Sequence, residues 1–246
     1  SVESVVLDNE TEINLKNDEK VCAGGGIPGE IGIVIFTAGV KPSLKFIEGT
    51  TIKYTCGGIS VNEHMETNVS GVYACGDCAE FKSAITGNVY PGKLATNAVP
   101  MAKVLADNLK GYKRKYEGFF NGAATKILDV YLGSAGLSEK EALRLGYEAV
   151  AGYSDVTTKF PVMPGVLKLR TKLVADRKTG FLLGGQVVSG EPVAARVDVI
   201  TMALQNRATV EGLMNHSYSA QPYQSSYPAE NCLVAAAEQL HEKIRA

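Results

Sequence analysis

The residues best suited to do chemistry are Gly76 and Asp77, which directly follow the apolar run of residues 72–75. Glycine has no Cβ, so the backbone at Gly76 can turn sharply and allow a ligand to come close. Asp77 would then present a carboxylate at the end of a buried strand, where open α/β folds bind their ligands. Because a carboxylate repels phosphate, this position suits the hydroxyl groups of a sugar or sugar alcohol.

Two cysteines flank this pair and form a C-x-x-C sequence at Cys75 and Cys78. A structural zinc site would need a second cysteine pair at suitable spacing, and the sequence has none. A thioredoxin-like redox motif would open a helix after a strand, a context that is partly met. The two intervening residues are already needed for the ligand hypothesis, so we expect no metal site, and redox chemistry remains the alternative.

The segment TNVSGVYACGD, residues 67–77, resembles the second flavin-binding motif of the FAD-dependent pyridine nucleotide-disulfide oxidoreductases, T-x(4–5)-hydrophobic-Y-A-x-G-D. Three further segments resemble this family in the same order, namely TAGVKPS, GGISVNEHMET and LATNAVPMA at residues 37–43, 57–67 and 94–102. The most similar branch contains the NADH oxidases and the coenzyme A disulfide reductases. The resemblance continues through the C-terminal half and covers almost the whole chain.

The resemblance implies an FAD site in which Gly76 approaches the cofactor and Asp77 holds its ribityl chain. NAD(P)H is then the expected co-substrate of the parent enzyme. The resemblance also implies that the start of a helix meets the flavin ring, where free N–H groups and the positive end of the helix dipole would stabilise negative charge. The alternative is a helix that only packs against the core, and one helix can do both, with its first turn at the flavin and its apolar stripe in the core. The residues at this helix start are Leu94, Ala95, Thr96 and Asn97.

The family also implies parts that this sequence does not show, namely two GxGxxG nucleotide-binding units and an upstream redox-active cysteine. Residues 24–29 match GxGxxG, but the β-rich run of residues 31–36 follows them where the fingerprint needs a helix. The chain also lacks an initiator Met and a signal peptide. We therefore expect the C-terminal portion of a longer flavoenzyme, whose missing N-terminal half determines the electron acceptor.

Composition and charge exclude several other classes. Of the 246 residues, 45% are hydrophobic and 21% are charged, which is ordinary for a globular protein. A net charge of −1 offers no basic surface for nucleic acid, and no apolar run approaches the ~20 residues needed to span a bilayer. Five cysteines without a secretion signal fit a reducing compartment. We expect a cytoplasmic protein that binds neither nucleic acid nor membrane.

The pattern predicts an α+β fold with two parts. The first is a partial remnant of the FAD- and NAD-binding domains, β-rich and with one long helix, and the second is an interface domain. Residues 1–49 have a strand-like sequence and are the expected tail of the NAD(H)-binding domain. Residues 50–112 are the expected C-terminal part of the FAD-binding domain, with a helix over residues 94–109 that ends near Gly111. Its predicted apolar stripe is Leu94, Ala98, Met101, Ala102, Leu105 and Leu109.

Residues 113–246 are expected to form an α/β interface domain through which the protein forms a homodimer. Apolar and polar residues alternate around Leu169 and Leu173, which predicts an antiparallel sheet with helices on one side. A capping box at Ser138 predicts a short helix that stops at Gly146. The expected strands are residues 125–132, 148–158, 166–175 and 181–189, and the expected helices are residues 192–205 and 228–245.

The loop of residues 215–230 is rich in aromatic residues, prolines and hydroxyl groups. The resemblance implies that it crosses the dimer interface near the partner's flavin, with Tyr218 and Tyr223 as catalytic residues that assist thiol chemistry. Interface packing is the alternative, because tyrosine is enriched at interfaces. His216 is followed by serine where related enzymes have proline, which argues against a general acid–base role.

Two functions follow from these patterns. The first is the C-terminal portion of a flavin-dependent NAD(P)H oxidoreductase, resembling either an NADH oxidase or a coenzyme A disulfide reductase. The alternative is a stand-alone dimerisation or binding module without catalytic activity. We expect the 246 residues alone to be inactive in either case.

Overall fold

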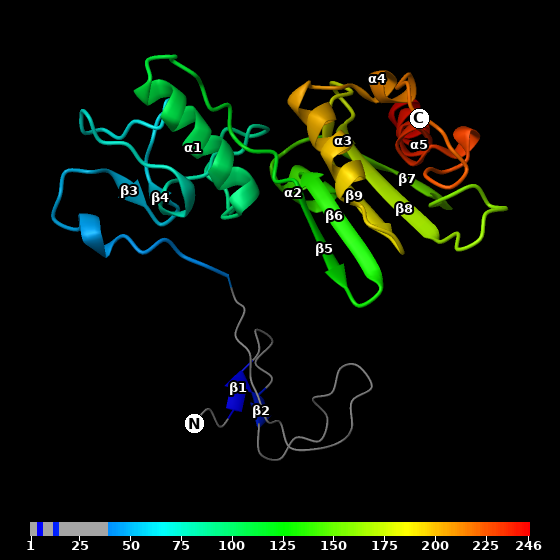
Figure 1. Cartoon of the computed structure of the whole chain (residues 1–246), viewed down its shortest axis with the longest axis horizontal. Coiled ribbons are helices and arrows are strands. Elements are labelled where there is room, and N and C mark those ends of the chain that lie inside the picture. Colours follow the sequence, from blue (N-terminus) through cyan, green and yellow to red (C-terminus); the bar gives the residue numbers. More distant parts are fainter. Residues whose placement is uncertain (1–3, 7–11, 15–38) are drawn as a thin grey trace. The chain divides into compact units, whose positions relative to one another are not determined.

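The computed structural model describes residues 4–6, 12–14 and 39–246 (Figure 1). The chain divides into two units, Ser1–Val40 and Lys41–Ala246. In the first unit, β1 (Ser4–Val6) and β2 (Glu12–Asn14) pair antiparallel. This confirms two of the strands predicted near the N-terminus. The glycine-rich run of residues 24–29 and the strand predicted after it lie outside the described residues.

The second unit begins with a loop-rich region, which we define as residues 41–122. Its small core contains Phe81 and Phe119, whose ring centroids lie 5.9 Å apart with perpendicular ring planes. Met65 and Met101 are fully buried beside them. Few regular elements surround this core: η1 (Lys45–Ile47), β3 (Tyr54–Thr55), β4 (Gly58–Ile59), η2 (Gly76–Cys78) and α1 (Ala95–Leu109).

The strand predicted over residues 72–75 is wrong. Tyr73 forms a single bridge with Glu66, and the chain then turns into the short helix η2. Ala74 is the only residue of the run that is fully buried. In the described part of the chain, no second strand pairs with this run, so the segment is extended but does not form a ladder.

The helix predicted over residues 94–109 is confirmed, and α1 ends two residues before Gly111, which has a φ of +90°. Its predicted apolar stripe is partly wrong. Met101 is buried as expected, but Ala102 and Leu109 are exposed. The buried face instead contains Asn97 and Val104. The buried face of α1 is rotated relative to the predicted stripe, because the polar residue Asn97 packs toward the core. Hydrophobic periodicity follows apolar residues only, so it could not indicate this.

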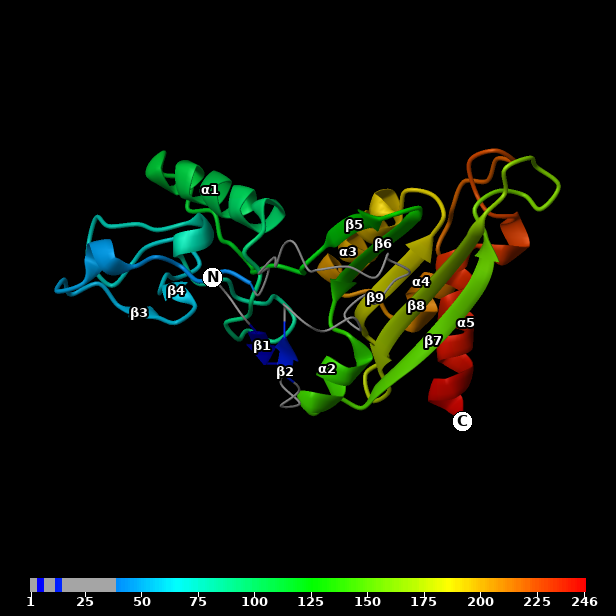
Figure 2. The ribbon, with the colours of Figure 1, turned by 90° about the horizontal axis from the view of Figure 1, so that it is seen from below.

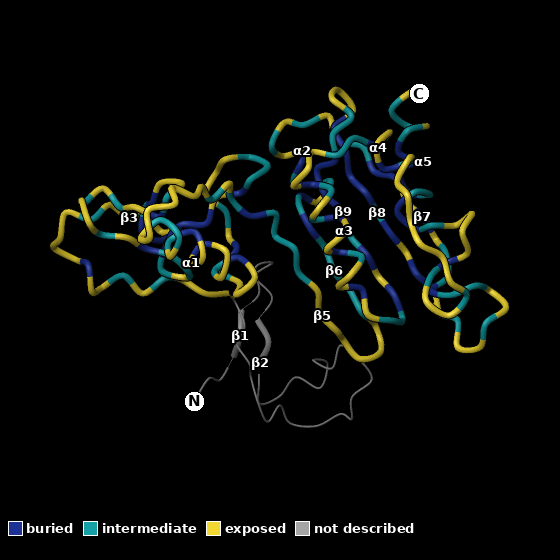
Figure 3. The backbone as a smooth tube through the Cα atoms, turned by 45° about the horizontal axis from the view of Figure 1, so that its top comes forward, coloured by how far each residue is buried: buried dark blue, intermediate teal, exposed yellow. Residues whose placement is uncertain are grey.

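The remainder of the second unit is a sheet region, residues 123–246, built on a five-stranded antiparallel sheet with the order β5-β6-β9-β8-β7. Figure 3 shows that β8 is largely buried whereas the edge strand β5 is exposed. The strands that were predicted around residues 148–189 are confirmed. The five strands are β5 (Ala123–Ile127), β6 (Val130–Gly136), β7 (Ala149–Thr157), β8 (Lys168–Asp176) and β9 (Leu182–Ser189).

The single strand predicted over residues 125–132 is a hairpin. The chain turns at Leu128 and Asp129, and Ile127 pairs with Val130 across the turn. Leu128 has a φ of +51° and a side chain that is 88% exposed. An exposed leucine in the left-handed region is not a turn signal, so an apolar run concealed the reversal.

Three helices cover one face of the sheet, α3 (Ala194–Gln205), α4 (Val210–Met214) and α5 (Cys232–Arg245), and Figure 2 shows them behind the strands. The two long helices were predicted, but α4 was not. The shared core contains Leu173, Ile200 and Leu240, all of them buried. Burial of one fully apolar side chain of this size contributes about 1.5–3 kcal/mol, so this face carries much of the stability of the sheet.

The prediction that helices cover only one side of the sheet is incomplete. Leu173 and Val174 are adjacent in β8 and therefore point to opposite faces, yet both are fully buried. Val174 belongs to a second cluster that includes Ala142 of α2 (Glu139–Arg144). The cap of α2 is confirmed, because the Ser138 Oγ accepts a hydrogen bond from the Glu141 backbone N–H at 3.2 Å.

Candidate cofactor-binding site

The predicted residues Gly76 and Asp77 lie in η2, which is a tight turn rather than the end of a long strand. Gly76 has a φ of +74°, a left-handed conformation that favours glycine, and its carbonyl accepts a hydrogen bond from the Ala79 backbone N–H at 2.9 Å. The Asp77 side chain is exposed. Among the described residues, its carboxylate forms no hydrogen bond and no ion pair, so both oxygens can accept bonds from a ligand.

A second glycine packs closely against the backbone of this turn. Gly58, at the start of β4, has a φ of +136°, and a Cβ there would lie 2.5 Å from the carbonyl carbon of Ala79. Ile59 then bridges to Ala79 in parallel register. Only glycine allows this approach, so β4 constrains the position of η2.

The start of α1 also has the properties of a ligand site. Leu94 is the N-cap, in extended conformation, and its side chain does not cap the helix. The first turn contains no acidic residue. Within the described part of the chain, the backbone N–H groups of Ala95 and Thr96 make no hydrogen bond. Unpaired N–H groups at a helix start favour an electron-rich ligand.

The structure brings these two segments together. A Cβ built on Gly76 would lie 3.9 Å from the Cβ of Ala98, in the first turns of α1. Asn97 differs from its predicted neighbours, because it is buried and its side-chain Nδ2 donates to the Gly92 carbonyl at 2.7 Å. Its amide therefore orients the helix start, while Leu94, Ala95 and Thr96 are exposed.

Sequence reasoning missed Lys93, the residue before the helix N-cap. Its Nζ donates hydrogen bonds to the backbone carbonyls of Gly57, Asp77 and Ala79, at 2.9, 2.7 and 3.2 Å. A lysine in a polar loop predicts a solvated side chain, and backbone acceptors leave no sequence pattern that could have indicated otherwise.

The two cysteines that flank Asp77 are free thiols. The Cys78 Sγ donates to the Cys75 carbonyl at 3.4 Å. Burial raises the pKa of the Cys75 thiol, and the nearby Cys78 raises it further. A raised pKa lowers the thiolate fraction and therefore the nucleophilicity. Across the described ranges, no group of three or more His, Cys, Asp and Glu side chains is arranged to hold a metal ion.

The two predicted catalytic tyrosines have different surroundings. Tyr218 lines a cavity of about 450 Å³ together with His216, whose ring centroid lies 6.3 Å from that of Tyr218. The Tyr218 hydroxyl donates to the Pro228 carbonyl at 2.6 Å, so its proton is already engaged. Tyr223 does not line this cavity, and its side chain is 58% exposed.

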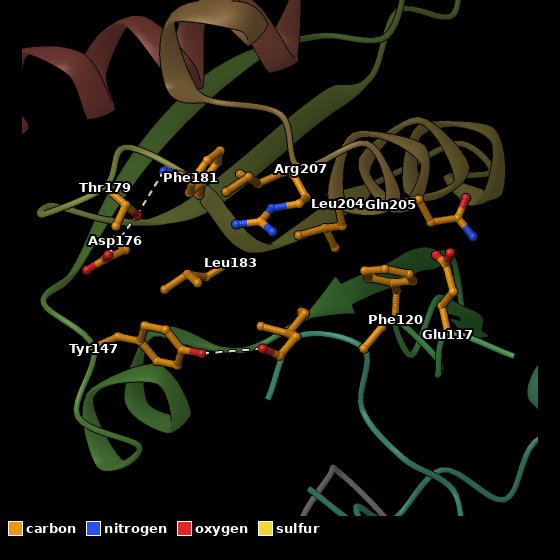
Figure 4. Close-up of a pocket in the computed structure, with 13 residues that line it drawn as sticks. Glu117, Phe120, Tyr147, Asp176, Thr179, Phe181, Leu183, Leu204, Gln205 and Arg207 are labelled. Carbon is orange, nitrogen blue, oxygen red and sulfur yellow. Dashed lines mark hydrogen bonds between the residues drawn. The ribbon is translucent and has the colours of Figure 1, made fainter. Parts of the chain in front are cut away.

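Another cavity, of about 400 Å³, lies over one end of the sheet and holds none of the predicted site residues (Figure 4). The Arg207 guanidinium lies over the Phe181 ring, 4.9 Å from its centroid. Tyr147 and Thr179 are held in its wall by hydrogen bonds to the Ile85 carbonyl and to Asp176. Its polar groups are exposed or already paired, so this cavity does not define a site.

Comparison with known protein families identifies the class to which this fold and its Gly-Asp turn belong. Two family models match it: the pyridine nucleotide-disulphide oxidoreductase model over residues 2–102, and the pyridine nucleotide-disulphide oxidoreductase dimerisation domain over residues 123–232. The chain belongs to the pyridine nucleotide-disulphide oxidoreductase family, as its sequence motifs predicted.

Relatives from several organisms support this assignment. An NADH oxidase of Methanocaldococcus jannaschii is 31% identical over 193 residues, which are 78% of this chain and 43% of the relative. A coenzyme A disulfide reductase of Staphylococcus aureus is 28% identical over 222 residues, which are 89% of this chain and 50% of the relative. The structure of an NAD-dependent persulfide reductase from A. fulgidus matches with a TM-score of 0.83 at 25% identity, and the match covers 98% of this chain and 41% of that one.

The chain therefore spans half or less of the length of these relatives. In the residues that the structure describes, no helix is both long enough and apolar enough to cross a membrane.

Proposed function

We propose that this chain is the C-terminal portion of a flavin-dependent NAD(P)H oxidoreductase of the NADH oxidase or coenzyme A disulfide reductase type. The names of the relatives support this proposal. A further one, an NAD(P)H coenzyme A polysulfide/persulfide reductase of Pyrococcus horikoshii, is 36% identical over 70% of this chain.

FAD is the cofactor that the site residues fit. The Asp77 carboxylate is exposed and would accept hydrogen bonds from ribityl hydroxyls, next to a glycine that leaves room for the chain of the cofactor. The free N–H groups of Ala95 and Thr96 would face the electron-rich edge of the flavin ring. When bound, FAD supplies hydride and electron transfer, and the protein holds and tunes it.

The observation that carries this proposal is the contact between η2 and α1. Gly76 lies next to Ala98, so the segment that carries the carboxylate lies against the first turns of an uncapped helix, although seventeen residues lie between Asp77 and Ala95. A helix that only packs against the core needs neither feature. The two together fit a ligand that has hydroxyl groups at one end and an electron-rich ring at the other.

The division of the chain into domains is part of the same proposal. Residues 1–49 form the tail of an NAD(H)-binding domain, residues 50–112 the C-terminal part of an FAD-binding domain, and residues 113–246 an interface domain that forms a homodimer. The match of residues 123–232 to a dimerisation domain supports the last of these. Tyr218 and Tyr223 would then act near the partner's flavin.

A second function, a dimerisation module without activity, is favoured by the partial site. Among the described residues, Asp77 and the start of α1 supply only part of a flavin site. Flavin absorbance of the purified 246-residue chain, NADH oxidation and light scattering separate the two. A colourless, inactive dimer supports the module, whereas bound flavin with NADH turnover supports the oxidoreductase.

The main proposal is tested by Asp77→Ala in the complete polypeptide that contains these residues. A charge-assisted hydrogen bond contributes about 1.5–3 kcal/mol, so FAD affinity should fall about tenfold or more. Asp129→Ala is the matched control, because Asp129 is an exposed aspartate in the β5–β6 turn. Equal FAD affinity of the two variants in a fluorescence titration would contradict the assignment of Asp77.

A further inference from the structure

One lysine links the two segments of the proposed flavin site to each other and to the turn between β3 and β4. The ammonium of Lys93 carries three N–H donors, and each has a backbone acceptor, on Gly57, Asp77 and Ala79. Gly57 belongs to the turn between β3 and β4, whereas Asp77 and Ala79 belong to η2 and its exit. Lys93 itself lies two residues before α1 begins. A single group therefore joins the turn, the carboxylate-bearing segment and the helix start.

The surroundings of this ammonium are partly apolar. Its Nζ lies 5.0 Å from the centroid of the buried Phe81 ring, where a cation is attracted to the aromatic face. Burial lowers the pKa of Lys93, and the charges of Asp77, Cys78 and Glu80 oppose that shift. Removing the ammonium would leave three carbonyl groups without their protein donor, two of them in partly buried contacts.

The Asp77 contact is made by its carbonyl and not by its carboxylate. The main chain of Asp77 is held while its side chain stays available. Gly58 packs tightly against the same segment, where a Cβ would meet the Cys78 and Ala79 backbone. η2 and its exit are thus held by this close contact and by two of the three hydrogen bonds of Lys93.

We propose that Lys93 is a positioning residue for the cofactor site: it fixes the backbone of η2 relative to the start of α1, so that the Asp77 carboxylate and the α1 N–H groups bind the same ligand. This inference rests on the proposed function. Lys93 has no role in the chemistry, and it acts through Asp77 and the helix start.

The experiment titrates FAD into the apo form of the complete polypeptide, followed by flavin fluorescence. Lys93→Met keeps most of the length of the side chain and removes all three donors, so the Kd for FAD should rise about tenfold. Lys93→Gln keeps two donors and should lose less affinity than Lys93→Met. Lys82→Met is the matched control, because the Lys82 Nζ also donates to a backbone carbonyl of the loop-rich region, that of Val61 at 3.2 Å, away from η2. It should bind FAD within about twofold of the unaltered protein.

A double-mutant cycle with Asp77→Asn separates positioning from a general loss of stability. If Lys93 acts through Asp77, Lys93→Met should weaken FAD binding much less in the Asp77→Asn background than alone. Additive losses, or equal affinities for Lys93→Met and Lys82→Met, would overturn the inference. Should Lys93→Met lose its apo circular dichroism spectrum, Lys93→Gln takes its place in the cycle under the same criteria.

The cycle also keeps the two proposals distinct. An Asp77→Asn variant that binds FAD as the unaltered protein does would remove the proposed role of Asp77, whatever Lys93 does. A large effect of Asp77→Asn with none for either Lys93 variant would leave the flavin site standing and reject the lysine.

Discussion

The loop-rich region and the sheet region are stabilised in different ways. In the sheet region, continuous backbone ladders join five strands, and helices bury both faces at one end. In the loop-rich region, side chains hold the backbone: Lys93 binds three carbonyls, and the Asn108 Nδ2 donates to those of His64 and Arg114. A ladder is insensitive to most single side chains, whereas a loop fixed by side chains depends on each of them. The proposed cofactor site lies in the region of the second kind.

The largest test of this comparison is Phe81→Ala in the loop-rich region. Phe81 is 1% exposed and packs edge-on against Phe119, so the substitution should destabilise its surroundings by about 3–5 kcal/mol. Because the two regions have separate main cores, amide hydrogen exchange should accelerate around Ala79 and Tyr90 and stay slow in β8.

Phe46→Ala is the control for this experiment, because Phe46 lies in the same region and is 69% exposed. It should leave exchange rates unchanged. Equal acceleration in β8 and in the loop-rich region after Phe81→Ala would mean that the two regions open as one cooperative unit, and the comparison would fail.

The next test is Gly152→Ala in the sheet region. A Cβ on Gly152 would lie 2.3 Å from the Ala236 carbonyl oxygen, so α5 must move away from β7. Overpacking of this kind should lower the free energy of unfolding by about 1–3 kcal/mol in a urea titration. Gly212→Ala, in α4, is the matched control and should be near neutral, because its Cβ meets only the Thr209 side chain, at 3.3 Å. Similar losses for both variants would show that the α5–β7 contact is not tight.

The same contrast explains how much the sequence could predict. The alternation of apolar and polar residues in β8 could be recognised in the sequence, because Leu169 and Leu173 face the helices while Lys168 and Arg170 face away. It failed at Val174, since the short helix α2 buries the second face there. The β5–β6 turn escaped prediction because its first residue, Leu128, has no turn propensity.

The candidate site was predictable only in part, for a similar reason. Gly76 and Asp77 could be found because glycine and a carboxylate are required by type at a fixed spacing. Lys93 could not, because its partners are carbonyl oxygens, which every residue carries. Nor could periodicity indicate that Asn97 turns toward the core and binds the Gly92 carbonyl.

A smaller, pH-dependent effect is expected at Tyr116 in the loop-rich region. Burial raises its pKa to about 12, against about 10 for an unfolded chain. Between pH 10 and 12 the folded state holds the phenolic proton more tightly than the unfolded state. This contribution to stability is therefore complete below pH 10 and is lost as the pH rises toward 12.

Tyr116→Phe should flatten the dependence of the urea midpoint on pH between pH 10 and 12. At pH 8 it should leave stability unchanged or raise it, because the buried hydroxyl has no hydrogen-bond partner among the described residues. Tyr112→Phe is the control, since Tyr112 is 74% exposed, and it should keep the slope of the unaltered protein. A Tyr116→Phe variant with that same slope would show that another group dominates this pH range.

The smallest effect is expected at the Arg170–Asp155 ion pair on the polar face of β7 and β8. The guanidinium binds both carboxylate oxygens, but the two side chains are 66% and 62% exposed. The hydrogen bond from Arg170 lowers the pKa of Asp155, so Arg170→Ala should raise that pKa in an NMR titration. The urea midpoint should not change measurably, because exposed pairs contribute little and nine register pairs already join the two strands.

Lys93→Met should lower the urea midpoint measurably, because no backbone ladder replaces the three hydrogen bonds of Lys93. If Arg170→Ala proved the more destabilising of the two, side chains would matter as much in the sheet region as in the loops, and the contrast between the regions would not hold.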